Sequence, residues 1–343
     1  MYDKNAFALT RKDFLRGTLV GAVSLALGSR VALAAEPVKV GFIVPDYEEM
    51  RWKAADQRFF EEEAKKLNLD IVVQSSNNSE SQQANQVENM LTLGVQVLVL
   101  TPVNANAAAA LVVKAKRAGV PVIDYNFLIP KSDVAVFIGR DAVEIGESIG
   151  SAALKARPKG NYILCFGDQG MSVAVDTAKG NLNALQPAID AGDITVISQQ
   201  YNKAWSTNSA RAQVENALTQ ANNDVAAVVC SNDGMAYGAI QALQAQGLAG
   251  KVFVTGVDCE PHAQELIREG LLSVSNFSEF DGMGRQAAQS ALALATGKEV
   301  DAAGTIDNGS GKPVPWIKVP NVNVTKDNID EMTSDHAWWF AKA

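Results

Sequence analysis

The chain has 343 residues, more than one hydrophobic core usually organises, so its length predicts about two domains. A composition that is 47% hydrophobic and 20% charged excludes a disordered, collagen-like or coiled-coil protein. The net charge is -8 and no long run of lysine and arginine occurs, so nucleic-acid binding is not expected.

Residues 1–35 have the pattern of an export signal peptide. Basic residues precede an apolar stretch at 17–28, and the small residues Ala32 and Ala34 suit a signal-peptidase site. Residues 10–15 resemble the twin-arginine motif with Lys12 at the second arginine, which leaves both the Tat and the Sec route open. A permanent membrane anchor is the alternative, which the short stretch disfavours. We expect the mature protein outside the cytoplasmic membrane.

The rest of the chain alternates β-branched runs with amphipathic stretches, the pattern of repeated βαβ units. The expected strands form two groups: 38–44, 70–75, 95–100, 120–125 and 134–139, then 162–166, 194–199, 225–230, 251–255 and 272–276. Helices are expected at 52–67, 82–93, 105–118, 142–156, 208–220 and 235–246. This predicts an α/β protein with two similar, doubly wound parallel-sheet lobes.

Motifs for nucleotide binding and nucleophilic catalysis are absent from the sequence. No G-x-G-x-x-G follows the first expected strand, and neither a P-loop nor a G-x-S-x-G nucleophile elbow occurs. The histidines, His262 and His336, lie far apart and give little basis for a zinc site or a histidine-based catalytic centre. We therefore expect no catalytic residue, no cofactor and no metal.

Polar and aromatic residues follow the expected strands, where parallel α/β sheets bind their ligands. Carboxylate, amide and guanidinium groups suit sugar hydroxyls, and aromatic rings suit the C–H faces of a sugar. The candidate ligand-binding residues are Asp46, Arg51, Trp52, Asn126, Trp205, Asn232, Asp258 and Asn276. A structural role is the alternative for several of them, such as helix capping by Asn232 or turn closure by Asp258.

The chain resembles the periplasmic sugar-binding proteins of ABC importers, most of all those of the D-xylose-binding type. The matching stretches are Arg51-Trp52, 87–90, 159–162, 215–219, Ser231-Asn232-Asp233, 238–243, 246–252 and Gly256-Val257-Asp258. The resemblance implies two lobes joined by a three-stranded hinge, with lobe one at 38–139 plus 257–300 and lobe two at 140–256 plus 301–343. Sugar contacts are implied for Arg51, Trp52, Trp205, Asn232 and Asp258.

The resemblance also implies a periplasmic monomer that works with an ABC permease and its ATPase subunits. Two other functions stay open: a sensory subunit that presents a sugar to a chemoreceptor or kinase, and a secreted carbohydrate-active enzyme. For the tail at 337–340, packing on the second lobe and contact with a partner are both open.

Three departures from the xylose-type pattern bear on the ligand. This chain has Tyr125-Asn126-Phe127 in place of Tyr-Asp-Arg, Met171-Ser172-Val173 in place of Asp-Asn-Asn, and Ser278 in place of a lysine. The pocket is therefore expected to be less charged and, on the second-lobe side, more apolar. This favours a polyol, a deoxy sugar or a substituted sugar over a free pentopyranose.

Overall fold

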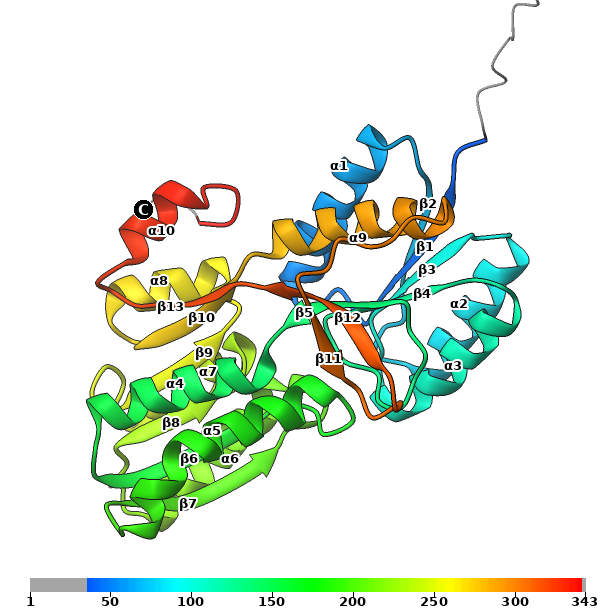
Figure 1. The fold of residues 1–343 in the computed structure, drawn as a ribbon. Helices are drawn as coiled ribbons and strands as arrows, with labels where there is room; N and C mark the ends of the chain where they lie inside the picture. The colour runs from blue at the N-terminus through cyan, green and yellow to red at the C-terminus, as the bar shows by residue number, and fades with distance from the viewer. Residues whose placement is uncertain (1–35, 341–343) are drawn as a thin grey trace, which may run out of the picture. The chain divides into compact units, whose positions relative to one another are not determined.

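The computed structural model describes residues 36–340, so the expected export signal lies outside the described residues. Among those described, no helix has the length and apolar character needed to cross a membrane. The strands belong to two separate sheets (Figure 1).

The first sheet has seven strands in the order β11-β12-β5-β4-β3-β1-β2. Neighbouring strands are parallel except for the hairpin of β11 and β12. The central strands are almost wholly buried apolar runs, as expected when helices cover both faces of a sheet. The strands are β1 (Lys39–Val44), β2 (Asp70–Ser75), β3 (Val97–Leu100), β4 (Val122–Tyr125), β5 (Val136–Arg140), β11 (Gly304–Asp307) and β12 (Pro313–Val319).

The second sheet has six strands in the order β13-β10-β9-β8-β6-β7, and β13 is its antiparallel edge strand. The strands are β6 (Gly160–Phe166), β7 (Ile194–Tyr201), β8 (Ala227–Cys230), β9 (Phe253–Val257), β10 (Val274–Ser278) and β13 (Asn321–Val324). In each sheet the first five strands of the chain lie in the order second, first, third, fourth, fifth. The predicted fold class of two similar, doubly wound lobes is confirmed, and in such sheets ligands bind beyond the carboxyl ends of the strands.

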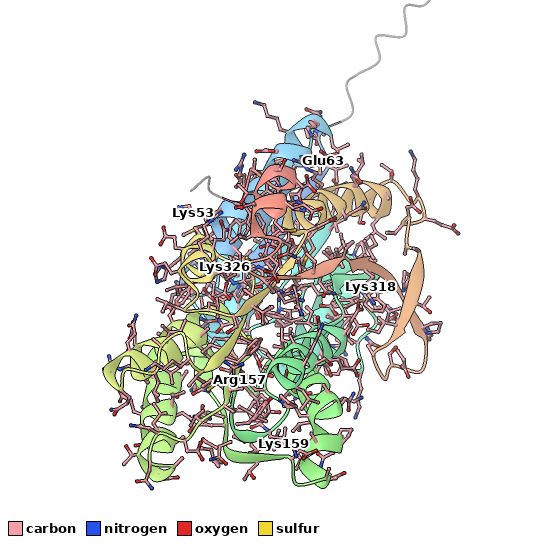
Figure 2. The ribbon with its side chains drawn as sticks, turned by 90° about the vertical axis from the view of Figure 1, so that its left-hand side faces the viewer. Lys53, Glu63, Arg157, Lys159, Lys318 and Lys326 are labelled. Carbon is pink, nitrogen blue, oxygen red and sulfur yellow. The ribbon has the colours of Figure 1, made fainter. Side chains whose placement is uncertain are left out.

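Helices pack in pairs that bring distant segments of the chain together. Blue α1 and orange α9 lie side by side in Figure 1, and Gln289 of α9 donates to Glu63 of α1, which Figure 2 labels. Helices α4 and α5 pack so closely that a Cβ on Gly146 would lie 2.1 Å from the Thr177 carbonyl oxygen. The helices of the first lobe are π-helical turn η2 (Trp52–Gln57), α1 (Arg58–Lys66), α2 (Glu80–Thr92), α3 (Ala105–Arg117) and α9 (Phe280–Ala295).

The second lobe holds the other helices, and sequence-encoded caps fix the start of several. Asp141, Ser206 and Asn232 each accept a hydrogen bond from a backbone N–H of the first turn, the usual role of an N-cap side chain. The helices are α4 (Ala142–Ala156), α5 (Ser172–Asp190), the short turn η3 (Lys203–Trp205), α6 (Thr207–Gln220), α7 (Asp233–Ala245), α8 (Pro261–Glu269) and α10 (Ile329–Asp335).

The chain passes between the two sheets at three places: after β5, after β10 and after β12. By sheet membership, the first lobe comprises 37–140 and 280–319, and the second lobe 141–278 and 321–340. This differs from the expected division, which puts 257–300 in lobe one and 301–343 in lobe two. The physical reason is that β10 pairs with β9 and continues the second sheet, whereas the β11–β12 hairpin pairs with β5 and extends the first.

Candidate functional site

A small cavity lies where strand-end loops of the two lobes meet, and we call it the central cavity. Its volume is about 20 Å³, which is room for about one water molecule. Five of the eight candidate residues from the sequence line it: Arg51, Trp52, Trp205, Asn232 and Asp258. The other lining residues are Glu49, Phe127, Arg140, Ile145, Val173, Thr177, Ser231 and Val257.

Arg51 is held rigidly on the first-lobe side of the central cavity. Its Nε and Nη2 donate to the two carboxylate oxygens of Asp56 at 3.0 and 2.8 Å, and the Tyr125 hydroxyl donates to the same carboxylate at 2.7 Å. The guanidinium lies between the rings of Trp52 and Phe280, 4.2 and 4.0 Å from their centroids. Burial alone would lower the pKa of Arg51, but the neighbouring carboxylates raise it, so the residue keeps its charge.

Asp258 links the lobes because it follows β9 of the second lobe and meets two arginines of the first. Its Oδ1 lies 2.7 Å from Nη1 of Arg140 and 3.5 Å from Nη1 of Arg51. Burial lowers the pKa of Arg140, and the Asp258 carboxylate opposes that shift. Arg51, Arg140 and Asp258 thus form a charged group that joins the two lobes. Hydrogen bonds between ionised partners are stronger than those between neutral groups.

The tail at 336–340 packs behind this group and contacts both lobes. Trp339 donates from Nε1 to the carbonyl oxygens of Asp258 and Cys259, at 3.3 and 2.7 Å. Both of these residues have positive φ, 96° and 50°, a conformation that costs energy for residues other than glycine. Trp338 packs edge-on against Phe59 of the first lobe and lies near Phe277 of the second. Of the two sequence alternatives, the tail thus packs on the protein, on both lobes rather than on the second alone.

Asn232 and Glu49 form a second contact across the cleft. Oδ1 of Asn232 accepts from the Met235 N–H, as an N-cap does, while its Nδ2 donates to Oε1 of Glu49 at 3.0 Å. Asn232 therefore caps α7, as the structural alternative predicts, and also lines the cavity. Its contact with a ligand stays a prediction. Burial, followed by the nearby carboxylates of Asp258, Asp46 and Glu260, raises the pKa of Glu49 well above its ordinary value, and Arg51 opposes the shift.

The raised pKa of Glu49 predicts a pH-dependent stability. A carboxyl whose pKa is higher in the folded than in the unfolded state binds more protons when folded, so its contribution is present at low pH and lost as pH rises through the folded pKa. Glu49→Gln should flatten the fall in melting temperature from pH 5 to 8, measured by circular dichroism. Glu48→Gln, at an exposed position in the same turn, should leave the slope as in the parent; equal slopes in all three proteins would contradict the expectation.

Trp205 enters the wall of the central cavity from a strained turn. Ala204 and Trp205 have φ of 52° and 55°, and the Ala204 N–H donates to Oδ2 of Asp168 at 2.7 Å, which holds the turn. The indole packs directly on Gly167, where a Cβ would lie 2.2 Å from the ring. Its Nε1 approaches the Met171 sulfur at 3.1 Å. The Trp205 indole is thus held by packing on Gly167 and by the contact of its Nε1 with Met171.

Three candidate residues lie outside the lining of the central cavity. Asp46 accepts from the backbone N–H groups of Glu48 and Glu49 and so holds the turn after β1. Asn276 donates to Asn321 and Asn323 of the edge strand β13. Asn126 lines a neighbouring cavity instead. Asp46 and Asn126 do lie in loops after strands, whereas Asn276, expected at a strand end, lies in the middle of β10. Position in the chain does not tell which way each side chain turns.

Sequence reasoning missed two charged residues of the central cavity, Arg140 and Glu49. Arg140 is the last residue of β5, so an expected strand ending at 139 already placed it at a strand end. Glu49 follows β1 in the same loop as Asp46 and Arg51. Arg140 also supplies a guanidinium on the first-lobe side, which offsets the one expected to be lost at Phe127. On the second-lobe side the wall of Ile145, Val173 and Thr177 is largely apolar.

The described residues contain no group of three or more His, Cys, Asp or Glu side chains that could hold a metal ion. Their cysteines, Cys165, Cys230 and Cys259, are buried free thiols, and burial raises the pKa of the Cys230 and Cys259 thiols. What the cavity offers is hydrogen bonding from paired charges, an amide and a hydroxyl, together with indole and phenyl rings. This arrangement suits reversible binding of a small polar molecule with apolar faces.

Comparison with known proteins supports this reading. Residues 40–299 match the family model of the periplasmic binding protein domain. The chain belongs to the periplasmic binding protein family. It is 35% identical over 317 residues to the D-xylose-binding periplasmic protein of Escherichia coli (strain K12), a match that covers 92% of this chain and 96% of that one.

Two further comparisons place this periplasmic binding protein within the family. The D-xylose-binding periplasmic protein of Haemophilus influenzae is 33% identical over 314 residues, covering 92% of this chain and 93% of the relative. Among solved structures, a carbohydrate transporter solute-binding protein from Chloroflexus aurantiacus in complex with D-glucose superposes with a TM-score of 0.81. That structure is 27% identical, and the match covers 88% of this chain and 98% of the other.

Proposed function

We propose that this periplasmic binding protein is the sugar-binding subunit of an ABC importer, which captures a neutral sugar or polyol in the central cavity and delivers it to a membrane permease and its ATPase subunits. The observation that carries the proposal is the cross-lobe group of Arg51, Arg140 and Asp258 beside two indole rings. Relatives named for sugar binding support it. The proposed location of the protein is the periplasm, and we propose that it works as a monomer.

Ligand capture is a shift between open and closed arrangements of the lobes. The central cavity has room for about one water molecule with the lobes as they stand, so a sugar enters only when the Glu49–Asn232 and Arg140–Asp258 contacts separate. A ligand that touches both lobes favours the closed arrangement by the extra contacts it makes there. Sugar hydroxyls then replace some of the direct contacts between the lobes.

The polar and the apolar side of the central cavity have different roles in the proposed function. Arg51, Arg140 and Asp258 hold hydroxyls on the polar side, together with Asn232, while Trp52 and Trp205 cover ring faces. The apolar wall at Ile145 and Val173 offers no partner to a hydroxyl. We therefore favour a ligand with fewer clamped hydroxyls than a free pentopyranose, such as a deoxy sugar, a substituted sugar or a polyol.

Trp205→Ala tests the stacking role. Removing the indole should weaken binding about 2- to 12-fold, because an aromatic pair contributes about 0.5–1.5 kcal/mol beyond its buried area. The ring is only partly buried, so the variant should still fold. Calorimetric titration measures the affinity and a thermal melt checks the fold; unchanged affinity would count against stacking.

A thermal-shift screen against neutral sugars and polyols tests the function as a whole. A ligand that binds the folded state alone raises the melting temperature in proportion to the logarithm of its concentration at saturation. We expect at least one neutral sugar or polyol to do so, and charged metabolites such as citrate and phosphate to do nothing. Tight binding of D-xylose with no response to any polyol, deoxy or substituted sugar would overturn the preferred ligand class while leaving the importer function in place.

A further inference from the structure

A second and larger cavity lies beside the central cavity, and we call it the side cavity. Its volume is about 640 Å³, within the range of about 300–1,000 Å³ typical of small-molecule sites. It is bounded on the first lobe by the loop after β4, the end of β5 and the β11–β12 hairpin, and on the second by the first turns of α4 and α5. Arg140 and Val173 line both cavities, so the two are adjacent.

Two residues that line the side cavity carry buried polar atoms without partners. Asn126 is 3% exposed, yet neither its amide nitrogen nor its amide oxygen has a hydrogen-bond partner among residues 36–340. Arg140 is 7% exposed and donates from Nη1 to Asp258, while its Nε has no partner in the same part of the chain. Leaving buried polar atoms unpaired is costly, and proteins keep such groups where something else satisfies them.

The backbone at Asn126 is fixed in an uncommon conformation. Its φ is 64°, in the left-handed region that asparagine tolerates, and its N–H donates to the Ile138 carbonyl oxygen at 2.8 Å. The side-chain amide offers both a donor and an acceptor, which is the pattern that a sugar hydroxyl matches.

An indole forms part of the same first-lobe wall. Trp316 of β12 stacks on Phe137, with ring centroids 6.2 Å apart and an interplanar angle of 29°, and its Nε1 donates to the Gly139 carbonyl oxygen at 3.0 Å. The ring is half-buried and its orientation is fixed at both ends. An aromatic ring and an amide on one wall suit the two kinds of surface that a sugar presents.

The charges around the side cavity select against anions. The lining includes Asp141, Glu144, Glu147, Asp176 and Asp307 against one arginine. Lys318, labelled in Figure 2 on the strand that carries Trp316, pairs with Asp141 and Glu144 and so is not free to hold a ligand charge. A neutral occupant fits this rim better than a uronic acid or a phosphorylated sugar.

We propose that the side cavity is a second subsite, and that the ligand is a neutral disaccharide whose first ring lies in the central cavity and whose second ring lies against Asn126 and Trp316. The inference rests on the proposed function, because the first ring uses the same central site. The Asn126 amide and the Arg140 Nε are closed to solvent with the lobes as they stand, so the ligand reaches them only when the lobes separate. A hydroxyl of the second ring then satisfies the Asn126 amide, and a linking or ring oxygen meets the Arg140 Nε.

Calorimetric titration of matched pairs tests the proposal: D-xylose with xylobiose, and D-glucose with cellobiose and maltose. We expect one disaccharide to bind at least about 10-fold more tightly than its monosaccharide. Trp316→Ala should reduce that ratio about 2- to 12-fold, the range for loss of an aromatic contact. Asn126→Gly, which keeps the positive φ, should reduce the ratio as well. Tyr47→Ala removes an exposed aromatic ring that lines neither cavity and should preserve the ratio.

Other outcomes separate this inference from the proposed function. A monosaccharide that binds while every disaccharide binds more weakly overturns the second subsite and leaves the sugar-binding function intact. A disaccharide preference that survives both Trp316→Ala and Asn126→Gly also overturns the subsite as placed here. If only a polyol binds, the subsite is overturned and the proposed function stands; if neither a saccharide of either size nor a polyol binds, both fail.

Discussion

Replacing Asp56 by asparagine is expected to lower the free energy of unfolding by about 3 kcal/mol, near the low end of the range for breaking a buried ion pair. Asp56 is fully buried and accepts from both Arg51 and Tyr125, so Asp56→Asn leaves the Arg51 guanidinium without its bidentate carboxylate. The remaining carboxylate, Asp258, is 3.5 Å away, which limits the loss. Urea unfolding at pH 7, followed by tryptophan fluorescence, measures it.

The matched control for this prediction is Glu62→Gln. Glu62 forms exposed ion pairs with Arg58 and Arg285, so its replacement should change stability by about 0.5 kcal/mol or less. A loss below about 1 kcal/mol for Asp56→Asn, or an equal loss in both variants, would mean that Arg51 is not anchored as the geometry indicates.

Asp258→Asn is expected to weaken sugar binding about 10- to 100-fold, since hydrogen bonds to charged groups contribute about 1.5–3 kcal/mol. Asp258 is the second-lobe group that meets both arginines, so its charge orients two guanidiniums as well as contacting the proposed ligand. Titration calorimetry at 20 °C, below the melting temperature of the variant, measures the loss of affinity.

Asp190→Asn makes the same chemical change at the exposed end of α5 and serves as the control. It should bind the sugar as the parent does. An Asp258→Asn variant that is folded by circular dichroism and within about 3-fold of the parent affinity would remove Asp258 from the proposed site.

Much of the fold follows from local patterns in the sequence. Buried runs such as 38–44 and 225–230 are apolar on both faces, which only a covered parallel sheet explains, and the expected strands all appear. The hairpin of β11 and β12 was not predicted, because Pro313, Pro315 and a polar turn hide its strand pattern. That hairpin and the position of β10 decide how the lobes divide, and both depend on pairing between residues far apart in sequence.

The candidate site shows a similar limit. The expectation that ligands bind beyond the carboxyl ends of parallel strands selects Arg51, Asn232 and Asp258, because these ends converge in the fold. It cannot distinguish them from Asp46 and Asn276, whose side chains turn toward backbone N–H groups or a neighbouring strand. The difference lies in local turn geometry and in edge-strand pairing, which composition and spacing do not encode.

The structure changes the interpretation of Asn126, which stands in place of an aspartate of the xylose-type pattern. As a sequence change it removes a charge from the pocket, and the structure places the residue in the side cavity with both amide atoms unpaired among the described residues. A substituted sugar is one of the ligand classes that the sequence favours. The position of Asn126 in the side cavity makes a disaccharide the specific member of that class to test.

The central claim is that the two lobes close on one neutral sugar or polyol. Isothermal titration of the protein with the strongest responder of the thermal-shift screen tests it most directly. We expect saturable heat at one ligand per chain, with a negative heat-capacity change as apolar surface is buried between the ligand's ring faces and the indoles of Trp52 and Trp205. No saturable heat from any neutral sugar, polyol or disaccharide would contradict it.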